Sequence, residues 1–193
     1  KLSSRNQIFY TRTKDNINLV WKVSRMGDSP WLTNPEANQK AVQAYGFNSP
    51  FEEFAFALEL TRQGVKTVYP RAIYMTRRSR RNAHKPSDDR RYTAFADLRT
   101  PGGEPAVTSS CDYITIWGFW NGPDELLATQ DGQFYQAFNA KHAKAEGMIS
   151  DQLLAELMQQ KADRLARRGF EDLNPKPDHL LISFDPAQKL VLG

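Results

Sequence analysis

The amino-acid sequence predicts an α+β fold in which a small antiparallel sheet carries one key helix and is followed by helices and a β-hairpin. Three observations predict it. A helix with clear start and stop signals lies at residues 49–64, strand-like runs flank it on both sides, and a long helical pattern ends directly before two short apolar runs. Strands and helices therefore occur in blocks rather than in strict alternation, which is typical of α+β proteins.

The first predicted strand covers residues 18–23, Asn-Leu-Val-Trp-Lys-Val, where the side chains alternate well enough for a half-buried strand. Residues 27–48 are rich in Pro, Asn, Gly and Ser, with one helical turn predicted at residues 41–44. A connecting segment is therefore expected between this strand and the helix that follows.

The key helix has all of its punctuation in the sequence. Ser49 can act as the N-cap, Pro50 suits the first helical position, and Glu52 completes a Ser-x-x-Glu capping box. Gly64 provides the stop. Apolar residues mark two faces, which predicts a helix buried on most sides: Phe51, Phe54, Ala55 and Leu58 on one, and Phe56, Ala57 and Leu60 on the other.

The later elements follow in order. Residues 65–75 predict a strand pair or a bent strand that Pro70 confines to an edge or a bulge, and residues 113–117 form the best strand. Helices are expected near residues 131–145 and 150–168. The second has an apolar stripe and a solvated stripe, formed by Leu154, Met158 and Leu165 and by Lys161, Arg164 and Arg167 respectively.

Length and composition exclude several classes of protein. A chain of 193 residues with 40% hydrophobic content can bury one core, or one lobe and part of another. No apolar run approaches the roughly 20 residues that span a bilayer, and the start of the chain carries no secretory signal. The single cysteine, Cys111, excludes an internal disulfide, so a cytoplasmic location is expected. The missing initiator Met suggests a processed chain or a fragment.

The positive charge is concentrated in one segment. Residues 77–91 hold seven basic and two acidic side chains, a balance of +5, so the rest of a chain of net charge +4 sums to −1. The clustered arginines could bind nucleic-acid phosphates or an acidic protein surface, and they are Arg77, Arg78, Arg80 and Arg81. The alternative is a solvated loop, because charge runs usually are solvated, and the lack of interleaved aromatic side chains argues against base stacking.

Residues 169–192 read Gly-Phe-Glu-Asp-Leu-Asn-Pro-Lys-Pro-Asp-His-Leu-Leu-Ile-Ser-Phe-Asp-Pro and then Lys-Leu-Val-Leu. This order of helix end, polar loop, strand and hairpin resembles the catalytic loop of protein kinases and of the aminoglycoside phosphotransferase-like enzymes. The resemblance implies a kinase-like fold, divided into a sheet-containing part at residues 1–120 and a helical part at residues 121–193. It also implies ATP and Mg²⁺ as ligands, and a protein partner is a further expectation.

Earlier in the chain, Lys22 and Glu53 match the layout of the same superfamily. Lys22 lies on a strand, where the family places a lysine that contacts nucleotide phosphates, and the next helix offers a glutamate to hold it. Glu53 is the better partner, because the capping box already uses Glu52. The alternative for Lys22 is an ordinary surface lysine.

The family's catalytic loop can be aligned in two registers. In the first, Asp172 is the catalytic aspartate and a two-residue insertion brings His179 to the position of the metal-binding asparagine. In the second, residues 176–179 align without a gap and Asn174 replaces the aspartate, which implies a weak or inactive enzyme, a pseudokinase. Asp172 can also be a simple turn residue.

Other family signatures are missing. His179 is a poor ligand for Mg²⁺, which prefers oxygen donors, so Asp178 is the substitute metal ligand. No glycine loop precedes Lys22, and the chain has Val-Leu-Gly where Asp-Phe-Gly is expected. The rival hypotheses are therefore a basic nucleic-acid-associated module and a scaffolding protein that uses Trp117, Phe119 and Trp120 as its contact surface.

Overall fold

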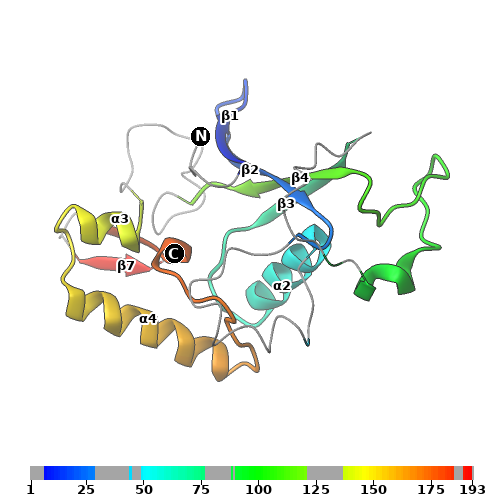
Figure 1. Cartoon of the computed structure of the whole chain (residues 1–193). Coiled ribbons are helices and arrows are strands. Elements are labelled where there is room, and N and C mark those ends of the chain that lie inside the picture. Colours follow the sequence, from blue (N-terminus) through cyan, green and yellow to red (C-terminus); the bar gives the residue numbers. More distant parts are fainter. Residues whose placement is uncertain are drawn as a thin grey trace.

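The computed structural model describes residues 7–28, 44, 49–76, 88, 90–120, 137–184 and 189–192. Two groups of elements make up this part of the chain. Figure 1 shows α2 against one face of the larger sheet, and α3, α4 and the C-terminal strands grouped beside them. The larger sheet contains β1 (Ile8–Arg12), β2 (Asn18–Arg25), β3 (Pro70–Met75) and β4 (Asp112–Gly118), and α2 spans Pro50–Arg62.

The four strands pair antiparallel in the order β1-β2-β4-β3. The predicted strand at residues 18–23 is present and continues to Arg25. β3 lies at the edge of the sheet and its register shifts between Pro70 and Ala72, as the proline predicted. The other edge is β1, a strand that was not predicted from the sequence. The predicted α+β class is confirmed.

Helix α2 begins as its sequence predicts. Ser49 Oγ accepts from the Glu52 backbone N–H at 3.0 Å, and Glu52 Oε2 accepts from the Ser49 N–H at 3.1 Å. The capping box is therefore confirmed. The prediction that α2 is buried on most sides is wrong, because the helix packs against one face of a small sheet. Phe56 and Leu58 keep 51% and 49% of their surface exposed.

The second group of elements has its own core. It contains β5 (Phe138–Asn139), β6 (Leu181–Phe184) and β7 (Leu190–Leu192), paired in that order, together with α3 (Ala140–Ala145), α4 (Asp151–Ala166) and the 3₁₀ turn η3 (Pro177–His179). Leu157 is the buried residue of α4, and Leu154 and Met158 pack around the same cluster. The predicted hairpin is confirmed as β6 and β7.

Some of the predicted elements lie partly outside the described residues. The helix expected near residues 131–145 is described only from residue 137, and α3 covers its end. Of the helical turn expected at residues 41–44, residues 41–43 are outside the described residues. Another 3₁₀ element, η1, spans Arg90–Phe95 at the end of the predicted basic loop. None of the described helices has the length and apolar character needed to cross a membrane.

We expect Ser49→Ala to lower the free energy of unfolding by about 1 kcal/mol, because it removes the oxygen that caps α2. Ser49→Gly should cost less, since glycine tolerates the N-cap conformation. Urea unfolding measures both variants. A larger loss with glycine than with alanine would instead point to the burial of the side chain.

Candidate active-site cleft

The register of the sheet decides where Lys22 points. Lys22 pairs with Thr115 of β4, and side chains alternate between the two faces of a strand. Tyr113 and Trp117 therefore share a face with Thr115, and α2 covers this face through edge-to-face contacts of Phe51 and Phe54 with those two rings, at centroid distances of 5.3 and 4.7 Å. Lys22 consequently lies beneath the helix.

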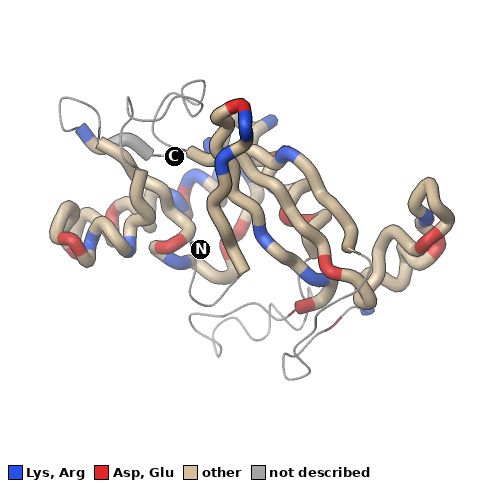
Figure 2. The backbone as a smooth tube through the Cα atoms, turned by 90° about the horizontal axis from the view of Figure 1, so that it is seen from above, with Lys and Arg blue, Asp and Glu red and all other residues tan. Residues whose placement is uncertain are grey.

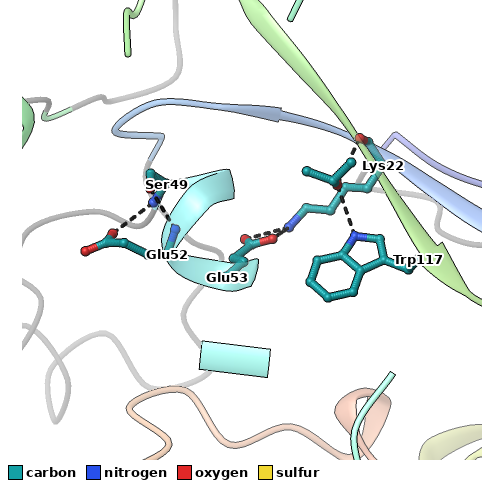
Figure 3. A network of polar contacts seen from close by, with 6 residues as sticks. Lys22, Ser49, Glu52, Glu53 and Trp117 are labelled. Atoms are coloured by element: carbon teal, nitrogen blue, oxygen red, sulfur yellow. Dashed lines mark hydrogen bonds and ion pairs between the residues drawn. The ribbon is translucent and has the colours of Figure 1, made fainter. Parts of the chain in front are cut away.

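The lysine ends in a bidentate ion pair with the helix. Lys22 Nζ donates to Glu53 Oε1 at 2.7 Å and to Oε2 at 2.8 Å (Figure 3), and both side chains are 29% exposed. Glu52 points elsewhere and also accepts from the Tyr92 hydroxyl at 2.6 Å. The contact expected between Lys22 and Glu53 is thus present, and phosphate binding by Lys22 stays a prediction.

The loop after α4 holds Asp172 tightly. Lys161 Nζ lies 2.5 Å from Asp172 Oδ2, and the backbone N–H of Asn174 donates to Oδ1 at 3.0 Å. Burial alone would raise the pKa of the Asp172 carboxyl, but the hydrogen bond and the charge of Lys161 outweigh it and hold this pKa below its ordinary value. Asp172 is therefore ionised at neutral pH.

The partner of Asp172 corrects one prediction. Lys161 was placed on the solvated stripe of its helix, but its side chain is only 19% exposed because it reaches over the helix end to the loop. Arg164 and Arg167 of the same stripe are exposed as expected. Lys161 is the functional candidate that sequence reasoning missed, since ten residues and a helix end lie between it and Asp172.

The two proposed metal-site residues point to different surroundings. His179 ends η3, and burial lowers the pKa of its imidazole against the opposing attraction of the Asp172 charge. Asp178, which is exposed as His179 is, lies 3.8 Å from Lys141 of α3. Within the described ranges, no three His, Cys, Asp or Glu side chains gather in a group that could hold a metal ion.

A cavity of about 390 Å³ lies between α2 and α4. Phe56 and Leu60 of α2 face it, and Asp172 and His179 line it from the opposite side, whereas Lys22 and Glu53 are not among its lining residues. Glu53, Phe56 and Leu60 follow one another at i, i+3 and i+7 and so share one side of α2. The ion pair and the cavity therefore lie along the same side of one helix.

Among the described residues, two direct contacts connect the two groups of elements beside this cavity. The rings of Phe56 and Phe170 meet edge to face at 6.5 Å, and Arg168 Nε donates to the backbone oxygen of Gln63 at 2.9 Å. In Figure 1 the segment that follows α4, drawn in orange, passes between the two groups of elements. The end of α4 is thus attached to the end of α2.

The arginine cluster lies outside the described residues. Arg77, Arg78, Arg80 and Arg81 are all in the undescribed segment, so their binding role stays a prediction. Near the end of the predicted basic loop, Arg90 forms an exposed ion pair with Asp88, and hydrogen bonds from Arg90 lower the pKa of Asp88 to about 2. Over the described elements, basic and acidic positions are interspersed (Figure 2).

The aromatic residues proposed as a scaffolding surface are partly buried within the chain. Trp117 packs on Phe54, and its Nε1–H donates to Thr115 Oγ1 at 3.0 Å. Phe119 meets Tyr10 edge to face, and Trp120 lines the cavity. These contacts use much of the surface that a scaffold would offer to a partner.

Comparisons of the chain with protein-family models, with curated proteins and with solved structures give no match. The candidate site therefore stands on its own geometry.

We expect Lys161→Met to lower the free energy of unfolding by about 1–3 kcal/mol, because it leaves the Asp172 carboxylate partly buried without its charged donor. In an Asp172→Asn background, the same substitution should cost clearly less. A double-mutant cycle by urea unfolding measures this coupling. Equal costs in both backgrounds would contradict the pairing.

Stability should fall when the pH is lowered from about 7.5 to 5, because His179 has a lowered pKa in the folded state. The unfolded chain then binds a proton near its ordinary pKa of 6.5, before the folded chain does. His179→Asn should reduce this loss of stability. Above that pH range, the free energy of unfolding of the variant should change with pH as it does in the unsubstituted protein. Unfolding free energies across the pH series provide the measurement, and an unchanged slope would count against the assignment.

Proposed function

We propose that the chain is an ATP-binding domain of the kinase-like phosphotransferase class that binds nucleotide and transfers phosphate weakly or not at all. The observation that carries the proposal is the ion pair between a strand lysine and a glutamate of the next helix, Lys22 and Glu53. A carboxylate in this position holds the ammonium in an extended conformation. A compact ammonium suits phosphate oxygens.

The arrangement around the pair supports the same class. Lys22 is on an inner strand of a four-stranded antiparallel sheet, α2 follows it, and β3 then returns to the sheet edge. A helix, a polar loop and a hairpin follow in the second group of elements, at α4, residues 167–180 and β6–β7. This is the order that the resemblance to protein kinases implies.

The surroundings of Asp172 support weak transfer rather than full activity. A catalytic aspartate must accept or orient a hydroxyl proton, yet Lys161 and the Asn174 backbone already donate to this carboxylate. In the second register Asn174 takes the catalytic position, and a carboxamide is a far weaker base than a carboxylate. With either alignment of the loop, the main activity that we propose for the domain is nucleotide binding.

Magnesium would enter with the nucleotide. Mg²⁺ is usually held by one or two carboxylates together with substrate phosphates, and Asp178 is the oxygen donor that this chain offers near η3. With ATP bound, the ion would neutralise phosphate charge.

A reducing cytoplasmic compartment suits the buried free thiol of Cys111.

Mg·ATP should raise the melting temperature of the protein in a concentration-dependent way, because a ligand that binds only the folded state stabilises it by mass action. Lys22→Met should abolish the shift and Glu53→Gln should reduce it. Lys14→Met, an exposed lysine in the turn between β1 and β2, is the matched control and should retain it.

Repeating the titration at about 0.15 M and about 0.4 M salt separates this site from non-specific binding to the arginine cluster, which salt would screen. The proposal fails if Mg·ATP leaves the melting curve unchanged. It also fails if the Lys22→Met and Lys14→Met proteins respond alike.

A further inference from the structure

The proposed nucleotide function does not involve the cavity between α2 and α4. Its walls are mainly apolar and come from both halves of the molecule, with Phe56 and Leu60 on one side and Leu157, Leu165 and Phe170 on the other. Its volume of about 390 Å³ lies within the range of roughly 300–1,000 Å³ that is typical of small-molecule sites.

We propose that this cavity binds a small amphipathic monocarboxylate, an aliphatic acid of medium chain length. The hydrocarbon chain would lie against the apolar walls, where each buried methylene contributes about 0.8 kcal/mol. The carboxylate would lie at the rim, next to Lys66 and Arg164. These two side chains come from the segment after α2 and from α4, so the ligand would contact both halves.

The positive charges at the rim of the cavity are the reason for proposing an anionic ligand. Lys66 and Arg164 both line the cavity and are exposed, and neither forms an ion pair within the described part of the chain. Lys161 also lines it but is already paired with Asp172. Two unpaired cations at the edge of an apolar pocket favour an anion with an apolar body.

The acidic groups set the charge that the ligand can carry. Glu171 and Asp172 line the same cavity, so its lining of three cations and two carboxylates sums to +1 with His179 neutral. A single negative charge is compensated there, whereas a polyphosphate would meet two carboxylates. The two carboxylates disfavour a nucleotide in the cavity, and the cavity is therefore distinct from the proposed site at Lys22.

Binding in this position would affect how the halves are held together. At present the Phe56–Phe170 contact and the hydrogen bond from Arg168 to Gln63 join α2 to the end of α4. A ligand chain between Phe56, Leu60 and Leu165 would add apolar contacts across the same boundary. Occupancy should therefore raise the stability of the whole chain.

Isothermal titration calorimetry with three probes of one chain length tests the proposal: octanoate, 1-octanol and octylammonium, each below its micelle threshold. We expect octanoate to bind at a single site and to raise the melting temperature. Octanol and octylammonium should bind about tenfold more weakly or worse. Equal binding of all three probes, or no binding of octanoate, would overturn the proposal.

Variants locate the site. The double variant Lys66→Glu/Arg164→Glu should weaken octanoate at least about tenfold, while Arg167→Glu, an exposed arginine of the same region that does not line the cavity, should leave it unchanged. Gln160→Trp should narrow the cavity from its exposed wall and also weaken binding. Octanoate affinity that is the same in all of these variants would place the ligand elsewhere.

The nucleotide site can be tested separately. Lys22→Met should leave octanoate affinity unchanged, because Lys22 does not line the cavity. Loss of octanoate binding in this variant, with its fold intact by circular dichroism, would contradict the separation of the two sites.

Discussion

The packing of α2 against the larger sheet is the constraint on which the rest of the structure depends. Phe51 and Phe54 meet the rings of Tyr113 and Trp117, and this aromatic contact fixes the rotation of the helix about its axis. With that rotation set, Glu53 faces the sheet and meets Lys22. A partly buried ammonium needs such a partner, since an unpaired charge at this position would be costly.

The same helix also determines how the two halves of the molecule meet. Its first turns hold the ion pair, and its later turns contribute Phe56 and Leu60 to the cavity beside α4. A small shift of α2 along or about its axis would therefore change the position of Glu53 and the shape of the cavity together. Helix α2 is therefore the element that the proposed nucleotide site and the cavity have in common.

The loop after α4 shows a different use of charge. Asp172 is held by Lys161 and by its own backbone turn, so its carboxylate supports the conformation of the loop. The ion pair also fixes the end of α4 relative to the loop, next to His179. An acid that is so fully engaged stabilises structure more readily than it accepts a proton, which is the basis for proposing weak transfer.

Local sequence patterns determined much of this fold. The capping box of α2, the strand that carries Lys22, the edge position of β3 at Pro70 and the final hairpin could all be predicted, because each depends on residues that are close together in the chain. The choice of Glu53 over Glu52 also followed from a local rule, since the cap uses one of the two. Only the tertiary structure decided that Lys161 pairs with Asp172, that α2 is partly exposed, and that Trp117 and Trp120 face inward. Those outcomes depend on which surfaces come to cover one another, and pairing across a helix end or between two halves of a chain leaves no periodic trace in the sequence.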